Sequence, residues 1–311
     1  MTAREAIEEL TAAAAAGQRG ALARLLSVIE RGDAAAREID AWAVGRTGDS
    51  YTVGVTGAPG AGKSTLVAAL VDVVRAAGER VAVLAVDPSS PFSGGAILGD
   101  RIRMRRHALD EGVFIRSMAS RGQPGGLALA TPEAVRVLGA AGFDWVIVET
   151  VGVGQIELDI AGRADTVVVV VNPGWGDAVQ ASKAGLLEIA DVFAINKADR
   201  PDVARTHREL QAALRMGGRD VPIVDTVAID GTGAAELWEA ILTHRRRITA
   251  SGELTRRRAT RAAAELRAVL HRMLAERAAA MAATRRGQEL SARVAEGTLD
   301  PWAAATELLG G

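Results

Sequence analysis

The stretch Gly57-Ala58-Pro59-Gly60-Ala61-Gly62-Lys63-Ser64, GAPGAGKS, decides the fold that this sequence predicts. It follows the apolar run YTVGVT at 51–56 and precedes the helical run TLVAALVDVV at 65–74. The pattern G-x-x-x-x-G-K-[ST] between a strand and a helix is typical of a loop that holds nucleotide phosphates. The glycines let successive N–H groups point at phosphate oxygens, and the next helix turns its positive end toward them. The alternative is a glycine-rich turn without a ligand, which requires neither the lysine nor the serine.

Two side chains of this loop have separate chemical roles. Lys63 would place its charge on the β- and γ-phosphates, and the Ser64 hydroxyl would be a ligand of Mg²⁺. The residues predicted to contact the nucleotide here are Gly57, Ala58, Pro59, Gly60, Ala61, Gly62, Lys63, Ser64 and Thr65.

Short Val- and Ile-rich runs alternate with longer Ala/Leu-rich helical stretches from Tyr51 to about Thr249. The predicted strands are 51–56, 80–86, 112–116, 144–149, 165–171, 191–196 and 222–227. Continuously apolar strands are typical of burial on both faces, and their alternation with helices predicts a mostly parallel α/β sheet. We therefore expect a P-loop NTPase sheet flanked by helices.

The texture differs at both ends of the chain. Residues 1–48 are rich in Ala, Leu, Glu and Arg with helical spacing, which predicts an extension of two or three helices before the nucleotide domain at 49–250. Residues 251–311 begin with a long helix whose apolar side chains share one side: Leu266, Val269, Leu270, Met273, Leu274 and Met281. The arginines elsewhere on this helix form either a solvated face or a contact surface for an acidic partner.

The bulk composition excludes several classes of protein. Lys and Arg total 37 against 38 for Asp and Glu, so no global charge recruits nucleic acid or an anionic membrane, and we expect neither as a partner. The chain has no cysteine, which excludes disulfides and thiolate chemistry. The amino-terminal stretch lacks the pattern of a secretory signal, and no apolar run is long enough to span a bilayer. We expect a cytoplasmic protein.

The run Phe143-Asp144-Trp145-Val146-Ile147-Val148-Glu149 supplies the second part of a phosphate site, an acid at the end of a buried strand. Glu149-Thr150-Val151-Gly152 has the form acid-x-x-Gly, in which a glycine N–H can sense the γ-phosphate. Val153 stands where Ras-like proteins have a water-positioning glutamine, so intrinsic hydrolysis should be slow. Gln155 is either the replacement catalytic group or a polar loop residue.

Asn196-Lys197-Ala198-Asp199 follows the strand at 191–196 and has the form N-K-x-D. The Asp199 carboxylate can accept hydrogen bonds from both the ring N–H and the exocyclic amine of guanine, which adenine does not offer. Lys197 would lie along the purine face, and Asn196 would tie this loop to the phosphate loop. Ala228 would offer its backbone N–H to the base, although Val227 replaces the usual serine before it. GTP and GDP are the expected ligands, and the alternative is a polar strand-to-helix turn.

Further stretches are specific to one family. These are Asp87-Pro88-Ser89-Ser90, the run Gly94-Gly95-Ala96-Ile97-Leu98-Gly99-Asp100, and Glu149-Thr150-Val151-Gly152-Val153-Gly154-Gln155. Together with the N-K-x-D motif, they resemble the MeaB/ArgK family of P-loop GTPases, whose members are chaperones of adenosylcobalamin-dependent acyl-CoA mutases such as methylmalonyl-CoA mutase.

The resemblance implies roles for single residues. Asp87 and Asp100 would join Ser64 and Glu149 in the magnesium and switch region. The segment from Asn172 to Lys183 resembles an additional switch of the family, in which Lys183 would serve partner-stimulated hydrolysis; otherwise Lys183 is a solvated helical lysine. The resemblance also implies that the C-terminal helices at 251–311 form a homodimer.

Other functional classes remain open from the sequence. A metal-insertion GTPase would require cysteine and histidine clusters, whereas this chain has no cysteine and four scattered histidines. A kinase acting on a transport protein would need a base for the acceptor hydroxyl, which no motif provides. A nucleotide-binding scaffold without turnover is the third alternative.

Overall fold

The computed structural model describes residues 3–32, 34–87, 107, 109–119, 130–150, 160, 162–175 and 180–310, with only the backbone described at 3, 87, 119 and 180–184. These residues fall into two compact units, Met1–Thr255 and Arg256–Gly311. The predicted residues Asp100 and Gln155 lie outside the described residues.

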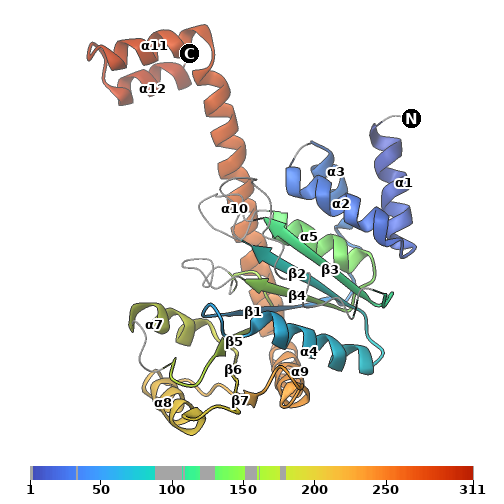
Figure 1. The fold of residues 1–311 in the computed structure, drawn as a ribbon. Helices are drawn as coiled ribbons and strands as arrows, with labels where there is room; N and C mark the ends of the chain where they lie inside the picture. Colours follow the sequence, from blue (N-terminus) through green and yellow to red (C-terminus); the bar gives the residue numbers. More distant parts are fainter. Residues whose placement is uncertain are drawn as a thin grey trace. The chain divides into compact units, whose positions relative to one another are not determined.

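The first unit is built on a seven-stranded sheet of order β3-β2-β4-β1-β5-β6-β7, in which every neighbouring pair is parallel (Figure 1). The strands are β1 (Tyr51–Gly57), β2 (Val81–Asp87), β3 (Val113–Ala119), β4 (Trp145–Thr150), β5 (Thr166–Val171), β6 (Val192–Asn196) and β7 (Ile223–Thr226). Each predicted strand is present, and the predicted parallel α/β fold is confirmed. Since all strands run the same way, their carboxyl ends meet at one edge of the sheet, where ligands of such folds bind.

Two hydrophobic cores cover the two faces of the sheet. Val53 and Val55 of β1 face the core that contains helices α4 (Lys63–Ala76) and α9 (Ala234–Ala250). Val146 and Val148 of β4 face the opposite core, which contains α5 (Ala130–Ala140), α7 (Gln180–Ile189) and α8 (Val203–Met216). Burial on both faces explains why the strands are continuously apolar rather than alternating.

Three helices precede the sheet: α1 (Ala3–Ala15), α2 (Arg19–Arg31) and α3 (Ala34–Ala43). The stripe Leu22, Leu25, Leu26 and Ile29 of α2 joins the core on the α5 side of the sheet. Two ion pairs link these helices to the sheet layer and α5, from Arg116 to Glu30 at 2.5 Å and from Arg136 to Asp40 at 2.7 Å. The helical character predicted for 1–48 therefore packs as part of the first unit.

The helices α10 (Glu253–Ala282), α11 (Arg285–Ala295) and α12 (Pro301–Leu309) close the chain. The Thr284 hydroxyl accepts a hydrogen bond from Gly287 at the start of α11, and the Asp300 carboxylate caps α12 in the same way. Every residue of α10 is described and none is buried. The predicted apolar stripe is solvent-exposed in the second unit, with side chains from 47% exposed at Leu270 to 61% at Leu266 and Leu274.

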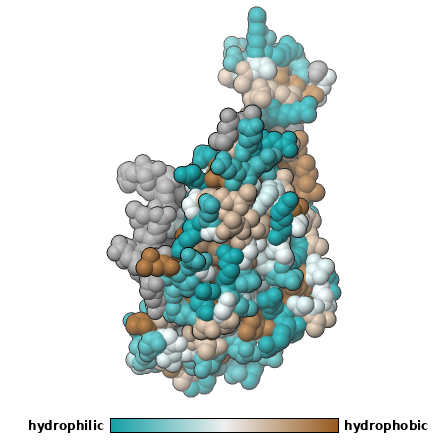
Figure 2. Space-filling model, turned by 90° about the vertical axis from the view of Figure 1, so that its right-hand side faces the viewer, coloured by the Kyte–Doolittle hydropathy of each residue, from teal (hydrophilic) through white to brown (hydrophobic). Residues whose placement is uncertain are grey.

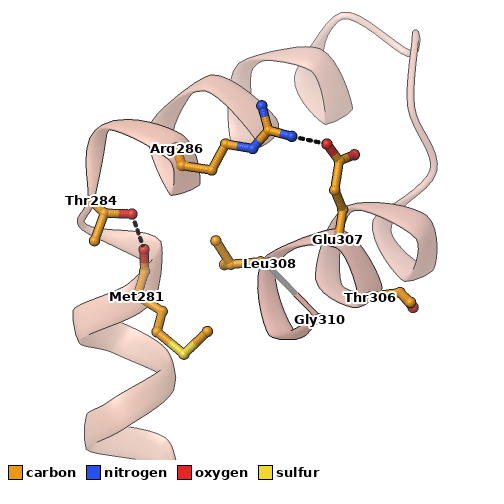
Figure 3. Close-up of a pocket in the computed structure, with 7 residues that line it drawn as sticks. All are labelled: Met281, Thr284, Arg286, Thr306, Glu307, Leu308 and Gly310. Atoms are coloured by element: carbon orange, nitrogen blue, oxygen red, sulfur yellow. Dashed lines mark hydrogen bonds and ion pairs between the residues drawn. The ribbon is translucent and has the colours of Figure 1, made fainter.

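A pocket of about 640 Å³ lies in the second unit, between the junction of α10 with α11 and the end of α12 (Figure 3). An ion pair between Arg286 and Glu307 crosses it, and Met281 and Leu308 supply apolar side chains. Its lining contains none of the residues predicted to bind the nucleotide.

On the face drawn in Figure 2, hydrophobic side chains lie in small groups among hydrophilic ones. Within the described residues, no helix combines the length and the apolar composition that a bilayer crossing requires.

Candidate nucleotide-binding site

The phosphate loop joins β1 to α4 at the carboxyl edge of the sheet. Gly57 ends β1 with φ of 132°, and a Cβ at this position would lie 2.0 Å from the Val170 carbonyl oxygen of β5. Gly62 precedes α4 with φ of 89°, and a Cβ there would lie 2.3 Å from the Asn196 side-chain nitrogen. Both sites require glycine for conformation and for space. The loop thus lies directly against the segment predicted to bind the base.

Lys63, the first residue of α4, is buried, with 6% of its surface exposed. Its Nζ donates hydrogen bonds to the carbonyl oxygens of Gly57, at 2.7 Å, and Ala58, at 3.0 Å. A buried ammonium group needs such acceptors to offset its loss of hydration. The amine is therefore held inside the curl of the loop, where phosphate oxygens are stronger acceptors than neutral carbonyls.

Ser64 and Glu149 meet beneath the loop, where the Ser64 hydroxyl donates to Glu149 Oε1 at 2.5 Å. Glu149 lies on β4, pairs with Val55 of β1 and is 4% exposed. A hydroxyl and a carboxylate in contact are the hard oxygen donors that Mg²⁺ prefers, so this pair fits a magnesium ion. Asp87 ends β2 beside β4, and only its backbone is described. No cluster of three acidic or histidine residues suited to a metal occurs among the described residues.

Asn196 connects the base loops to the phosphate loop. It is 2% exposed, its Nδ2 donates to the Ala61 carbonyl oxygen at 2.7 Å, and its Oδ1 accepts from the Ala228 amide at 3.0 Å. The Thr226 hydroxyl donates to the same Oδ1 at 3.3 Å. One buried amide therefore fixes three loops relative to one another, as predicted for Asn196. Sequence reasoning missed Thr226, whose only signal is a hydroxyl at the end of β7.

Lys197 and Asp199 occupy the turn after β6. Lys197 has a left-handed backbone with φ of 62°, and its Nζ donates to the Gly60 carbonyl oxygen at 2.6 Å. This bond fixes its aliphatic stem against the phosphate loop. Asp199 is exposed, and the neighbouring Ala198 amide donates to the Thr226 carbonyl oxygen at 3.0 Å. A carboxylate on a turn held at both ends is placed to accept hydrogen bonds from a ligand.

Lys183 lies in α7, and its side chain is not described. A second pair that sequence reasoning missed lies below the phosphate site, where the Thr150 hydroxyl donates to the Thr56 hydroxyl at 2.9 Å. This contact joins β4 to β1 directly before the acid-x-x-Gly turn begins.

With this geometry in place, the chain can be compared with known proteins. Residues 22–283 match the family described as methylmalonyl Co-A mutase-associated GTPase MeaB. The chain belongs to this family. The family is one of GTPases, so a guanine nucleotide is the ligand that it implies for the loops described above.

Individual relatives support this assignment. A protein of Pyrococcus abyssi is 47% identical over 316 residues, which cover 98% of each chain. The GTPase ArgK of Escherichia coli is 38% identical over 250 residues, 76% of each chain. The mouse protein named methylmalonic aciduria type A homolog, mitochondrial, is 36% identical over 219 residues, 68% of this chain and 53% of the mouse protein.

Two solved structures are similar in fold. The crystal structure of an LAO/AO transport system kinase matches with a TM-score of 0.72 and 28% identity, covering 98% of this chain and 96% of the other. HypB from Helicobacter pylori in complex with nickel matches with a TM-score of 0.50 and 18% identity, over 68% of this chain and 94% of HypB. At that identity the HypB likeness shows the fold alone.

Proposed function

We propose that this protein is a GTP-hydrolysing chaperone that gates cofactor loading into, and protects, an adenosylcobalamin-dependent acyl-CoA mutase of the methylmalonyl-CoA type. The observation that carries the nucleotide part is Asn196, which binds the phosphate loop and the predicted base loop through one buried amide. The family description, which names the mutase, supports the partner.

The proposed roles follow from the contacts of each residue. Lys63 exchanges the carbonyls of its own loop for β- and γ-phosphate oxygens, and Asp199 accepts two hydrogen bonds from guanine. Ser64 and Glu149, with Asp87 and Asp100, would hold Mg²⁺, which supplies positive charge to the phosphates when bound. Gln155 or Lys183 would provide the catalytic group that the motif after Gly152 lacks.

Phosphate release from GTP and from ATP, measured with and without the methylmalonyl-CoA mutase of the same organism, tests this proposal. We expect slow release from GTP alone, with an increase when the mutase is added. Equal release from both nucleotides would contradict the base assignment. A rate that the mutase does not change would contradict the chaperone role.

The similarity to the LAO/AO transport system kinase favours a second candidate, a kinase acting on a transport protein. The two candidates differ in the phosphate acceptor. GTP labelled at the γ-position gives free labelled phosphate if water is the acceptor and labelled protein if a transport protein is. The same experiment therefore separates hydrolysis from protein phosphorylation.

We further propose that residues 251–311 form a homodimer in the cytoplasm, while 1–48 and 49–250 act as the helical extension and the GTPase domain. The exposed stripe of Leu266, Leu270, Met273 and Leu274 on α10 supports a second copy as its partner, because unpaired apolar stripes on long helices are typical of helix association.

A charge placed in this stripe tests the dimer. Leu270→Glu should convert the dimer to a monomer in sedimentation equilibrium, since a carboxylate would be buried between two apolar faces. Ala264→Glu adds the same charge on another, exposed face of α10 and should leave the dimer intact. A monomeric wild-type protein, or a dimeric Leu270→Glu variant, would contradict this assignment.

A further inference from the structure

Helix α7 is held at its carboxyl end by an arginine from another part of the chain. Arg219 lies between α8 and β7, and its guanidinium donates to the carbonyl oxygens of Leu187, of Glu188 at 2.6 Å and of Ala190 at 2.8 Å. The last carbonyls of a helix have no partner within the helix, and a cation there also interacts favourably with the helix dipole. Arg219 therefore completes the end of α7.

The turn that leads toward α7 is fixed to the same neighbour. The Gly174 amide donates to the Thr206 hydroxyl at 3.0 Å, and Thr206, in the first turn of α8, is 2% exposed. Trp175, the next residue, packs against the core on this face of the sheet. The described parts of the connection from β5 through α7 are thus attached to the α8 region at both ends.

The location of this connection relates it to the nucleotide site. It leaves β5 directly after Val170, which pairs with Gly57 at the start of the phosphate loop. On its other side, α8 begins at Val203, shortly after the base-binding turn at Asn196 to Asp199. Arg219 and Thr206 therefore lock α7 to the helix that follows the base loop, while their own bonds go to neither nucleotide loop.

We propose that Arg219 and Thr206 are positioning residues that hold α7 for partner-stimulated GTP hydrolysis and are dispensable for nucleotide binding. This inference rests on the proposed function, in which α7 carries Lys183. An error in the placement of a helix costs rate rather than affinity when the helix contributes only to the transition state.

The test uses the full-length protein with methylmalonyl-CoA mutase and four substitutions. Arg219→Ala should lower the mutase-stimulated rate about tenfold or more, while the intrinsic rate and the Kd for GDP stay within about twofold. Arg219→Lys keeps the charge without the planar fork and should give an intermediate stimulated rate. Thr206→Val removes the acceptor and should act like Arg219→Ala, whereas Thr206→Ser retains the hydroxyl and should restore the stimulated rate.

Arg215→Ala is the matched control. Arg215 is exposed in the last turn of α8, and it lines the same pocket of about 280 Å³ as Arg219. Its removal makes the same change in charge without affecting the α7 carbonyls, and all three measured quantities should stay at their wild-type values. Equal losses in Arg215→Ala and Arg219→Ala would overturn the proposal.

A second measurement separates this inference from the function on which it rests. Amide hydrogen exchange of the GDP-bound protein should become faster in the last turn of α7 in Arg219→Ala, and should be unchanged in Arg215→Ala. Unchanged exchange in Arg219→Ala overturns the positioning role, as does an undiminished stimulated rate. If the mutase fails to stimulate even the wild type, the proposed chaperone function is wrong, and the claim about stimulated hydrolysis falls with it; faster exchange would then show an ordinary helix cap.

Discussion

The two edges of the sheet in the first unit both contain buried polar side chains, but these side chains have different partners. At the carboxyl edge, Lys63, Asn196 and Lys197 donate to backbone carbonyl oxygens of the phosphate loop. At the amino edge, the Tyr51 hydroxyl lies 2.7 Å from the Thr166 hydroxyl, which in turn lies 2.7 Å from His244 Nδ1. The first set binds loops, and the second set binds itself.

The amino-edge network continues into the strands. Asp191 lies 3.2 Å from His244 Nε2, and its other carboxylate oxygen accepts from the Val167 amide at 2.9 Å. Asp165 accepts from the Thr52 amide at 3.0 Å. These bonds join strands to one another and to α9, so the network stabilises the fold. Loop carbonyls, in contrast, are acceptors from which a ligand can displace Lys63, because charged phosphates bind an ammonium more strongly.

The largest effect on nucleotide binding should come from Lys63→Ala. The substitution removes the charge that would bind the terminal phosphates, and a loss of about a hundredfold or more in GDP affinity corresponds to about 2.7 kcal/mol or more. Isothermal titration with GDP measures the loss. Circular dichroism and the melting temperature check that the fold is retained.

Tyr51→Phe is the counterpart to Lys63→Ala at the amino edge, with one buried polar atom removed from the network. Its GDP affinity should equal that of the wild type. If Lys63→Ala bound GDP normally, or if Tyr51→Phe weakened binding as strongly, the functional division between the two edges would be wrong.

A smaller effect is expected from Asp199→Asn. The amide cannot accept both guanine hydrogen bonds, but it can donate to the carbonyl that replaces the exocyclic amine in xanthine. GDP affinity should fall by about tenfold to a hundredfold, about 1.4–2.7 kcal/mol, and affinity for xanthosine diphosphate should rise.

The control for this substitution is Asp202→Asn. Asp202 is an exposed acid at the start of α8 with a left-handed backbone that asparagine tolerates. It should leave the preference for guanine unchanged. Competition between the two nucleotides for each variant gives the result, and an unaltered guanine preference in Asp199→Asn would refute the base assignment.

The sequence predicted the strands and the nucleotide loops because their signals are local. Each strand is one apolar run, and G-x-x-x-x-G-K-[ST] and N-K-x-D each lie within eight consecutive residues or fewer. The amino-edge network was not predictable, since Tyr51 and Thr166 are 115 residues apart and meet only through the pairing of β1 with β5. Arg219 was missed for the same reason, because its partners on α7 precede it by 29–32 residues.

The single tyrosine of the chain allows the amino-edge network to be observed directly. Burial raises the pKa of Tyr51 to about 12, partly opposed by its hydrogen bond with Thr166. Absorbance at the tyrosinate band should therefore titrate near pH 12 in the folded protein and near pH 10 in denaturant, where the tyrosine has its ordinary pKa. No other side chain contributes to this band, so the midpoint belongs to Tyr51 alone.

The same shift predicts how stability depends on alkaline pH. The folded state keeps its proton more tightly than the unfolded state, so the stabilisation from Tyr51 is complete below pH 10 and is lost as pH rises toward 12. A difference of two pKa units corresponds to roughly 2.7 kcal/mol of unfolding free energy. Tyr51→Phe should lack this part of the alkaline loss, while it costs about 1 kcal/mol at pH 7 through the missing hydrogen bond. Urea unfolding of both proteins at pH 9 and pH 11 measures the difference. Parallel losses in wild type and Tyr51→Phe would show that the tyrosine hydroxyl is not held in the protonated state by the amino edge.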